Sequence, residues 1–313
     1  MGVSGFLSRT IEALWRLRNR RSLDAIGGCS ALLQARLHTL TDAESVKSAA
    51  DSLSRLLITA EGKLRQLRGQ DSDQGLPRII SQDGAENLRC LVLQDRTPWS
   101  DVAVADNGIP GMLTHEETKY YSYIGRFFSG EGLAVEVGPW LGRSTEYILR
   151  SLLGNPRFTG QKLHVFDDFI WRTWMERYYA KSDKPQEHQS FRFLFDRYMS
   201  AYQDDLVVQQ RKVAEDVGNQ DVARLSWNDG PIEMCFIDCG WLIEVNDGWY
   251  KVFVNHFIPN RTLIVMQDWG MCRRVPAEWS QQTKTFTDSK GSSLELVHEL
   301  AEGTIATFLF RGR

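Results

Sequence analysis

The sequence lacks any apolar run long enough to cross a lipid bilayer, for which about 20 consecutive apolar residues are needed. Its first residues also lack the uninterrupted apolar stretch of a secretory signal. The formal net charge of the 313 residues is only −3, so the chain as a whole does not attract nucleic acid. We therefore expect a cytoplasmic protein without a nucleic-acid partner.

Cysteine is scarce and irregularly spaced, which argues against a disulfide framework. The five cysteines are Cys29, Cys90, Cys235, Cys239 and Cys272. Cys235 and Cys239 have no second pair at zinc-like spacing, so they are better interpreted as small buried hydrophobic residues. Reduced thiols agree with a cytoplasmic location.

The first 75 residues contain few strand formers and predict an N-terminal helical arm. Leucines recur at steps of three and four over residues 53–67, with a matching stripe over residues 32–40. Such stripes favour an antiparallel helix pair or a homodimer contact. The polar stretch "RGQDSDQGLP" then marks a boundary, which gives two domains, residues 1–75 and 76–313.

Residues 6–21 predict a basic amphipathic helix within this arm. Leu7, Ile11 and Leu14 share one face, and arginines occupy the rest. A helix of this kind can lie on an anionic membrane, here the inner face, as a peripheral contact. Its apolar face could equally dock on the protein's own domain.

From residue 114 onward the pattern alternates between helix and strand. Thr114, with Glu117 three residues later, predicts a helix start. A long aromatic helical region is expected from the end of the second strand to about residue 202, and irregular structure over residues 79–112. The expected parallel strands cover residues 133–137, 163–166, 206–208, 234–237 and 262–266. "LELVHEL" and "TIATFLF" predict a closing antiparallel pair, so the fold class is α/β with a mostly parallel sheet.

Acidic residues follow the apolar strands with unusual regularity. Glu136 ends the first strand, Asp167 and Asp168 the second, and Asp238 and Asp268 two later ones. Ligands of open parallel sheets bind beyond the carboxyl ends of the strands. A single such acid would usually cap a turn, but the repeated placement predicts a binding site.

The loop after the first strand, "VEVGPWLGRST", excludes two phosphate-binding motifs. It lacks the lysine of a P-loop, and it has Gly138 and Gly142 but not the three glycines of a dinucleotide loop. A ligand with a ribose and a cationic amino-acid end fits the acids better, since one carboxylate can hold an ammonium group and another the ribose hydroxyls. S-adenosylmethionine is such a ligand.

The motifs resemble those of class I methyltransferases. "VEVGPWLGRSTEYI" is similar to their first motif, "HVFDDF" to the second-strand motif, and "IEMCFIDCGW" and "LIVMQDW" to the later ones. The group that the chain resembles is the macrocin-type sugar O-methyltransferases and relatives encoded beside glycosyltransferases, over about residues 111–310. The resemblance implies a Rossmann-like fold, S-adenosylmethionine as cofactor, and a sugar or other small-molecule or glycan acceptor.

The resemblance also implies roles for individual residues. Glu136, Gly138 and Gly142 would shape the methionine end, Ser144 would meet its carboxylate, and Asp167 would hold the ribose. Asp216, or Glu215 beside it, would contact the adenine. Asp238 and Asp268 would face the methyl-transfer zone.

Two roles are open for Asp238 and Asp268. They could bind Mg²⁺, which would acidify the acceptor hydroxyl, or one of them could act as general base. Metal-dependent relatives have two adjacent oxygen ligands in the last motif, whereas Trp269 follows Asp268 here.

The aromatic stretch after the second strand offers a candidate acceptor pocket. Trp171, Trp174 and Tyr178 could stack on a sugar ring, or they could form core between helix and sheet.

Two other functions compete with methyl transfer. One is a catalytically inactive binding or scaffolding protein of the same fold, which the missing second ligand at Trp269 would allow. The other is a nicotinamide-dependent oxidoreductase, which the glycine spacing disfavours.

Overall fold

The computed structural model describes residues 84–179 and 181–312. The predictions for the helical arm of residues 1–75, its boundary at residue 76, the membrane contact of residues 6–21 and the dimer contact lie outside the described residues. Among the residues that are described, none of the helices is both long and apolar enough to pass through a membrane.

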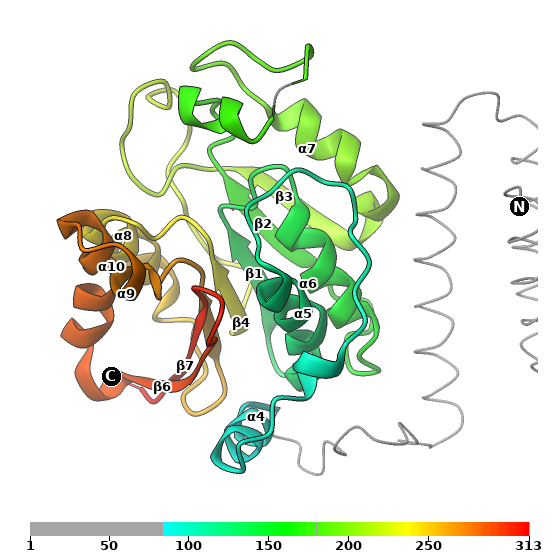
Figure 1. Ribbon diagram of the computed structural model, residues 1–313, viewed down its shortest axis with the longest axis vertical. Helices are drawn as coiled ribbons and strands as arrows, with labels where there is room; N and C mark the ends of the chain where they lie inside the picture. The colour runs from blue at the N-terminus through cyan, green and yellow to red at the C-terminus, as the bar shows by residue number, and fades with distance from the viewer. Residues whose placement is uncertain (1–83, 180, 313) are drawn as a thin grey trace, which may run out of the picture. The chain divides into compact units, whose positions relative to one another are not determined.

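A seven-stranded sheet forms the centre of the fold, in the order β3-β2-β1-β4-β5-β7-β6 (Figure 1). The first five strands are parallel, and β7 runs antiparallel to both β5 and β6. The bounds are β1 Leu133–Val137, β2 Leu163–Asp167, β3 Leu206–Gln210, β4 Ile232–Ile237, β5 Leu263–Met266, β6 Leu294–Glu299 and β7 Ala306–Phe310. The predicted class, a mostly parallel Rossmann-like α/β sheet with a C-terminal antiparallel strand, is confirmed.

Helices cover both faces of the sheet. On one face lie α5 (His115–Ile124) and α6 (Arg143–Leu153), and on the other α8 (Ile243–Phe253) and α10 (Glu278–Ser289), as Figure 1 shows. The described chain also contains α4 (Gly84–Leu93), α7 (Arg192–Tyr198) and α9 (Met271–Arg274). Burial on both faces explains why the parallel strands are apolar almost throughout.

Helix α5 begins with the predicted cap. The hydroxyl of Thr114 accepts from the backbone N–H of Glu117, and the Glu117 carboxylate accepts from the backbone N–H of Thr114. This reciprocal pair satisfies two N–H groups that the helix itself leaves without partners.

The pairing of β1 with β4 contains one extra residue. Leu133 stands opposite Ile232, but Ala134 stands opposite Met234, which leaves Glu233 without a counterpart. The buried Glu233 carboxylate accepts hydrogen bonds from the backbone N–H groups of four consecutive residues, 129–132. The irregularity is therefore stabilised by the side chain of the extra residue, Glu233.

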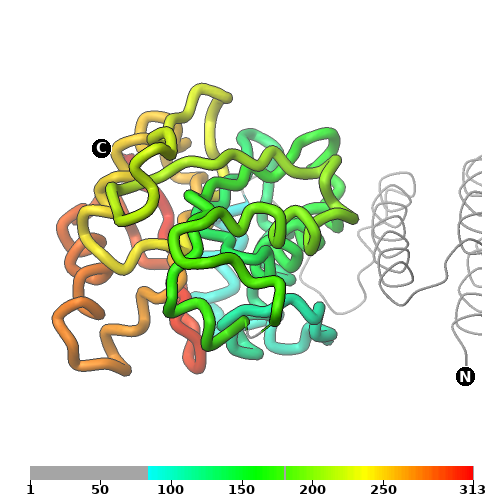
Figure 2. Tube along the Cα trace, turned by 90° about the horizontal axis from the view of Figure 1, so that it is seen from above, coloured from blue at the N-terminus to red at the C-terminus, as the bar shows by residue number. Residues whose placement is uncertain are grey.

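The long aromatic helix predicted after β2 is wrong. That segment holds the short helices η3 (Thr173–Arg177), α7 and η4 (Ser200–Asp205), with a bridge between Ile170 and Ser190. Phe169, Trp171 and Tyr179 are all buried, so the aromatic residues pack inward from a looped chain rather than along one helical stripe. Figure 2 shows the path of this segment in green. The irregular structure expected over residues 79–112 is also partly wrong, because α4 lies within it.

Candidate active site

The site is built at the carboxyl edge of the parallel strands. Because β1, β2, β4 and β5 are neighbours with the same direction, the residues that follow them meet at one edge. Each of these strands ends in or beside an acid, as the sequence predicted. The result is a group of carboxylates close enough for their charges to act on one another.

Glu136 is buried, with 1% of its surface exposed. Its Oε1 accepts a hydrogen bond of 2.7 Å from the Ser144 hydroxyl, whereas Oε2 is buried without a partner. Burial raises the pKa of Glu136 to about 7, against the lowering effect of the hydrogen bond from Ser144. Ser144 thus orients Glu136, a role that the resemblance did not imply.

Two glycines of the loop after β1 adopt conformations that other residues rarely take. Gly138 has φ +87° and Gly142 has φ +95°. A Cβ on Gly142 would stand 2.8 Å from Sδ of Met199. Gly142 precedes α6, whose first turn has no side-chain cap, so the backbone N–H groups of that turn are available to an anion.

Asp167 lies at the end of β2 and accepts a 2.6 Å hydrogen bond from the backbone N–H of Phe169. Burial, reinforced by the adjacent charge of Asp168, raises the pKa of Asp167 to about 8, although hydrogen bonds from Phe169 and Trp140 and the charge of Arg172 oppose the shift.

Asp168 has a different environment from its neighbour. Its Oδ2 forms a 2.6 Å ion pair with Arg172 and accepts a 3.0 Å hydrogen bond from Asn219. Burial raises the pKa of Asp168, but the Arg172 guanidinium outweighs burial and holds the pKa below its ordinary value. Asp168 is therefore held by side chains of the protein, whereas the hydrogen bonds to Asp167 come from the backbone.

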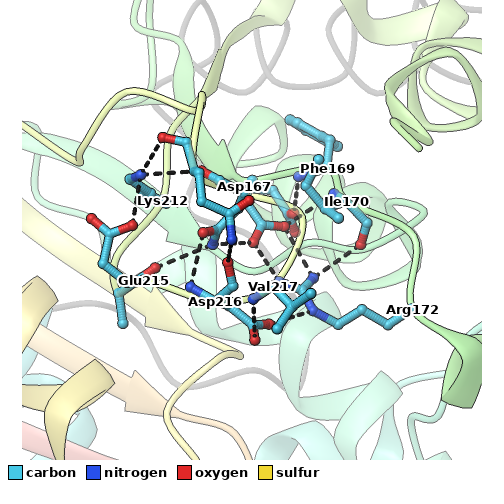
Figure 3. Close-up of polar contacts among 12 residues, drawn as sticks. Asp167, Phe169, Ile170, Arg172, Lys212, Glu215, Asp216 and Val217 are labelled. Atoms are coloured by element: carbon cyan, nitrogen blue, oxygen red, sulfur yellow. Dashed lines mark hydrogen bonds and ion pairs between the residues drawn. The ribbon is translucent and has the colours of Figure 1, made fainter. Parts of the chain in front are cut away.

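Asp216, the predicted adenine contact, is placed by the same arginine. Arg172 Nε donates to Asp216 Oδ2 at 2.8 Å, and the side chain of Asp216 is 51% exposed (Figure 3). The loop after β3 is thereby linked to the end of β2. Glu215, in contrast, pairs with Lys212 and Arg224.

Asp238 and Asp268 follow the adjacent strands β4 and β5. Burial raises the pKa of Asp238 well above its ordinary value, and the charges of Asp268, Glu136, Glu117 and Asp167 raise it further. Burial raises the pKa of Asp268 to about 6, and a hydrogen bond from the Trp241 indole N–H to its Oδ2 partly offsets this. The structure thus brings together the two carboxylates proposed for the methyl-transfer zone.

The sequence did not identify four residues at this edge. Tyr121 donates to Gln267 Oε1 at 2.9 Å, Gln267 donates to Thr304 at 3.1 Å, and Thr304 donates to Glu117 at 2.8 Å. This chain leads from the start of α5 to the residue beside Asp268. Glu117 was visible in the sequence as a helix cap, but its second function needs contacts with a residue 187 positions away.

The aromatic residues after β2 separate into two groups. Trp171 is fully buried, so the proposed stacking of a sugar on Trp171 is wrong. Trp174 and Tyr178 are exposed by 44% and 41%, and their rings lie 6.4 and 6.2 Å from Trp140 in the glycine loop.

The donor set fits S-adenosylmethionine. Oε2 of Glu136 and the hydroxyl of Thr145 are buried without partners. Thr145 belongs to the first turn of α6, and Glu136 accepts a hydrogen bond from Ser144 in the same turn. The surrounding carboxylates with raised pKa values are stabilised in their charged forms by a cation. A ligand with sulfonium and ammonium groups supplies that charge.

The donor set does not fit Mg²⁺. Octahedral magnesium needs oxygen ligands with free lone pairs, whereas one oxygen of Asp268 already accepts from an indole. Trp269, in the position of a second ligand, is buried and donates to Thr287 at 3.0 Å. Within residues 84–179 and 181–312, no cluster of three or more His, Cys, Asp or Glu side chains is arranged to hold a metal.

No protein-family model matches the chain, and no curated protein matches it. Among solved structures, cofactor-bound Rv0187 from MTB is 12% identical, with 75% of this chain and 94% of that chain covered and a TM-score of 0.42. CalS11, a TDP-rhamnose 3'-O-methyltransferase of calicheamicin biosynthesis, is 13% identical, with 78% and 100% covered and a TM-score of 0.40. A SAM-dependent O-methyltransferase from Thermotoga maritima is 8% identical, with 72% and 71% covered and a TM-score of 0.37.

Proposed function

We propose that this protein is an S-adenosylmethionine-dependent O-methyltransferase that acts on a sugar or a glycosylated small molecule. The observation that carries the proposal is the unpartnered, buried Oε2 of Glu136 within a group of strand-end carboxylates. Such a group is unfavourable in an empty site and becomes favourable beside a cationic ligand.

Four parts of the chain would hold the cofactor. Glu136 binds the ammonium group, and the free N–H groups at the start of α6 bind the carboxylate. Asp167 accepts the ribose hydroxyls. Asp216 lies on the next strand's loop, at the position proposed for the adenine contact. Gly138 and Gly142 keep side chains out of the space between these groups.

When bound, S-adenosylmethionine supplies a methyl group to the acceptor oxygen, and its sulfur keeps the electron pair of the broken bond. The protein's task is to orient the acceptor hydroxyl and take its proton. Asp268, with a pKa of about 6, is charged at neutral pH and is the proposed general base. Burial and the charges of neighbouring carboxylates raise the pKa of Asp238 well above its ordinary value, which favours its protonated form.

The support for a sugar acceptor is the resemblance of the motifs, together with exposed aromatic rings on both sides of the strand edge. Sugars bind to such rings through their C–H faces while their hydroxyls meet carboxylates. The second candidate function is a catalytically inactive scaffold, which the following experiment distinguishes from the enzyme.

Titration calorimetry with S-adenosylmethionine, S-adenosylhomocysteine and NAD tests the proposal. We expect both methionine-derived ligands to bind and NAD to fail. A Glu136→Gln variant should lose this binding, while Glu131→Gln, on the surface of the same domain, should retain it. Binding of NAD alone would favour the oxidoreductase, and cofactor binding without methyl transfer to any sugar would favour the scaffold.

A further inference from the structure

Two tryptophans from distant parts of the chain form a stacked pair beside Asp268. Trp241 lies in the loop after β4, and Trp279 is the second residue of α10. Their ring centroids are 5.0 Å apart with an interplanar angle of 14°. Trp241 remains 43% exposed, although a large aromatic ring is normally withdrawn from water.

The loop that carries Trp241 is fixed on both sides. The Gly240 carbonyl accepts from Thr283 at 2.5 Å and from Asn246 at 2.6 Å. The backbone N–H of Ile243 donates to Gln282 at 3.0 Å. Because Thr283 and Gln282 belong to the same helix as Trp279, the stacked pair is a preorganised surface.

The orientation of the pair points to a ligand ring. The only polar atom of the Trp241 indole, Nε1, donates to Asp268, which leaves the ring face away from Trp279 to contact a ligand. A carbon surface with a carboxylate at its edge matches a pyranose, which has a C–H face and hydroxyls around its rim. A hydroxyl of a ring stacked there would lie near the proposed general base.

The charges at this edge disfavour a phosphorylated ring. The charges that act most strongly on Asp238 are those of four other carboxylates. The nearby arginines of α9 are engaged: Arg273 pairs with Glu299 at 2.7 Å, and Arg274 donates to the Gly303 carbonyl at 3.0 Å. A phosphate beside these carboxylates would be repelled without a compensating cation.

We propose that Trp241 and Trp279 form the acceptor platform and bind an unphosphorylated pyranose ring of a glycoside, with one hydroxyl directed to Asp268. This inference rests on the proposed function, because it places the methyl acceptor.

Saturation-transfer NMR on the full chain tests the platform without turnover. The probes are four neutral methyl pyranosides, of gluco, galacto, manno and rhamno configuration, with glucose 1-phosphate and catechol for contrast. We expect saturation of at least one methyl pyranoside and none of glucose 1-phosphate. Trp241→Ala and Trp279→Ala should reduce the signal about fivefold or more, whereas Trp241→Phe, which keeps a ring face, should retain most of it.

Two further variants locate the effect. Phe193→Ala removes an equally exposed ring, 47% accessible, from α7 and should leave the signal unchanged. Trp174→Ala tests the other exposed indole. A pyranoside signal that survives Trp241→Ala, or that disappears with Trp174→Ala instead, would overturn the platform. Catechol binding that depends on Trp241, with no pyranoside binding, would overturn the ligand class.

Calorimetry with S-adenosylhomocysteine on the same samples separates the two proposals. Cofactor binding without any pyranoside signal overturns the platform and leaves the methyltransferase proposal intact. A pyranoside signal that depends on Trp241, without cofactor binding, supports the platform and overturns the methyltransferase proposal.

Discussion

Gly138 lies directly against the backbone of Asp238. A Cβ on Gly138 would stand 2.6 Å from the Asp238 carbonyl oxygen and 2.8 Å from its carbonyl carbon. The neighbouring chain is also tied at this point, because the Asp238 N–H donates to the Val137 carbonyl at 2.9 Å. The loops after β1 and β4 are therefore in close contact here, with no room for a side chain at position 138.

Gly138→Ala should accordingly disturb the site. The methyl group would push the two loops apart, so we expect at least a tenfold loss of cofactor affinity and a destabilisation of roughly 1–3 kcal/mol. Gly160→Ala is the control, since Gly160 also has a positive φ, +77°, but has open space around its Cβ position. Equal effects of the two substitutions on affinity would mean that backbone strain, not the close approach, is responsible.

Glu136→Gln should abolish cofactor binding and yet stabilise the empty protein at high pH. The folded-state pKa of Glu136 is about 7, above its unfolded value of 4.5. Burial therefore favours the protonated form, and stability is lost as pH rises from the unfolded value through 7. At pH 8 we expect the variant to gain roughly 1–3 kcal/mol in urea unfolding and to gain little at pH 4. A variant that is less stable than wild type at pH 8 would contradict the buried, unpaired state of Oε2.

Asp167→Ala should weaken cofactor binding by roughly 2–4 kcal/mol, because a bidentate carboxylate in a desolvated site is lost. Circular dichroism should show an unchanged fold. Asp196→Asn, on the exposed side of α7, is the matched control. Unchanged affinity in calorimetry would remove Asp167 from the site.

Asp268→Asn should separate binding from chemistry. As a lost general base it should reduce methyl transfer by roughly 10² or more, while cofactor affinity stays within about a few-fold of wild type. The assay follows the labelled methyl group from cofactor to the pyranoside that binds best. Because the donor set does not suit magnesium, a chelator should leave wild-type activity unchanged; inactivation that Mg²⁺ reverses would reassign Asp268 as a metal ligand.

Cofactor affinity should increase with pH between about 6 and 8.5. Glu136 and Asp167 have pKa values of about 7 and 8 in the empty site, and a cationic ligand favours their charged forms. Binding of the cofactor therefore releases protons. Its affinity increases with pH because the two carboxyl groups are already deprotonated at higher pH. Calorimetry at pH 7.5 in two buffers with different ionisation enthalpies measures the release, which should be smaller for S-adenosylhomocysteine because it lacks the sulfonium charge. Proton uptake on binding would contradict the assignment.

The elements that could be predicted from the sequence are those whose pattern is local. All five parallel strands were predicted, because short runs of β-branched and aromatic residues bounded by turns indicate buried strands. The acids at the strand ends were found from the same pattern. The α5 cap was predicted because Thr114 and Glu117 are three residues apart.

What the sequence missed depends on distant partners. Helical spacing of aromatic residues after β2 was mistaken for a helix, because the pattern does not show that Trp171 packs on Tyr179 and Phe191 from a loop. The pairing of Trp241 with Trp279 and the link from Glu117 to Thr304 join segments 38 and 187 residues apart, and neither segment carries a signal for the other.

The unpaired Glu233 has a consequence at the opposite end of β4. Side chains along a strand alternate between the two faces, so one added residue reverses the face of every residue that follows. Asp238 comes five positions after Glu233. The number of residues between the start of β4 and Asp238 therefore decides on which face of the sheet the Asp238 side chain lies. Deleting Glu233 would change no residue of the site, yet it would exchange the faces of Asp238 and Ile237. The face on which Asp238 lies is therefore set by a single insertion near the start of β4.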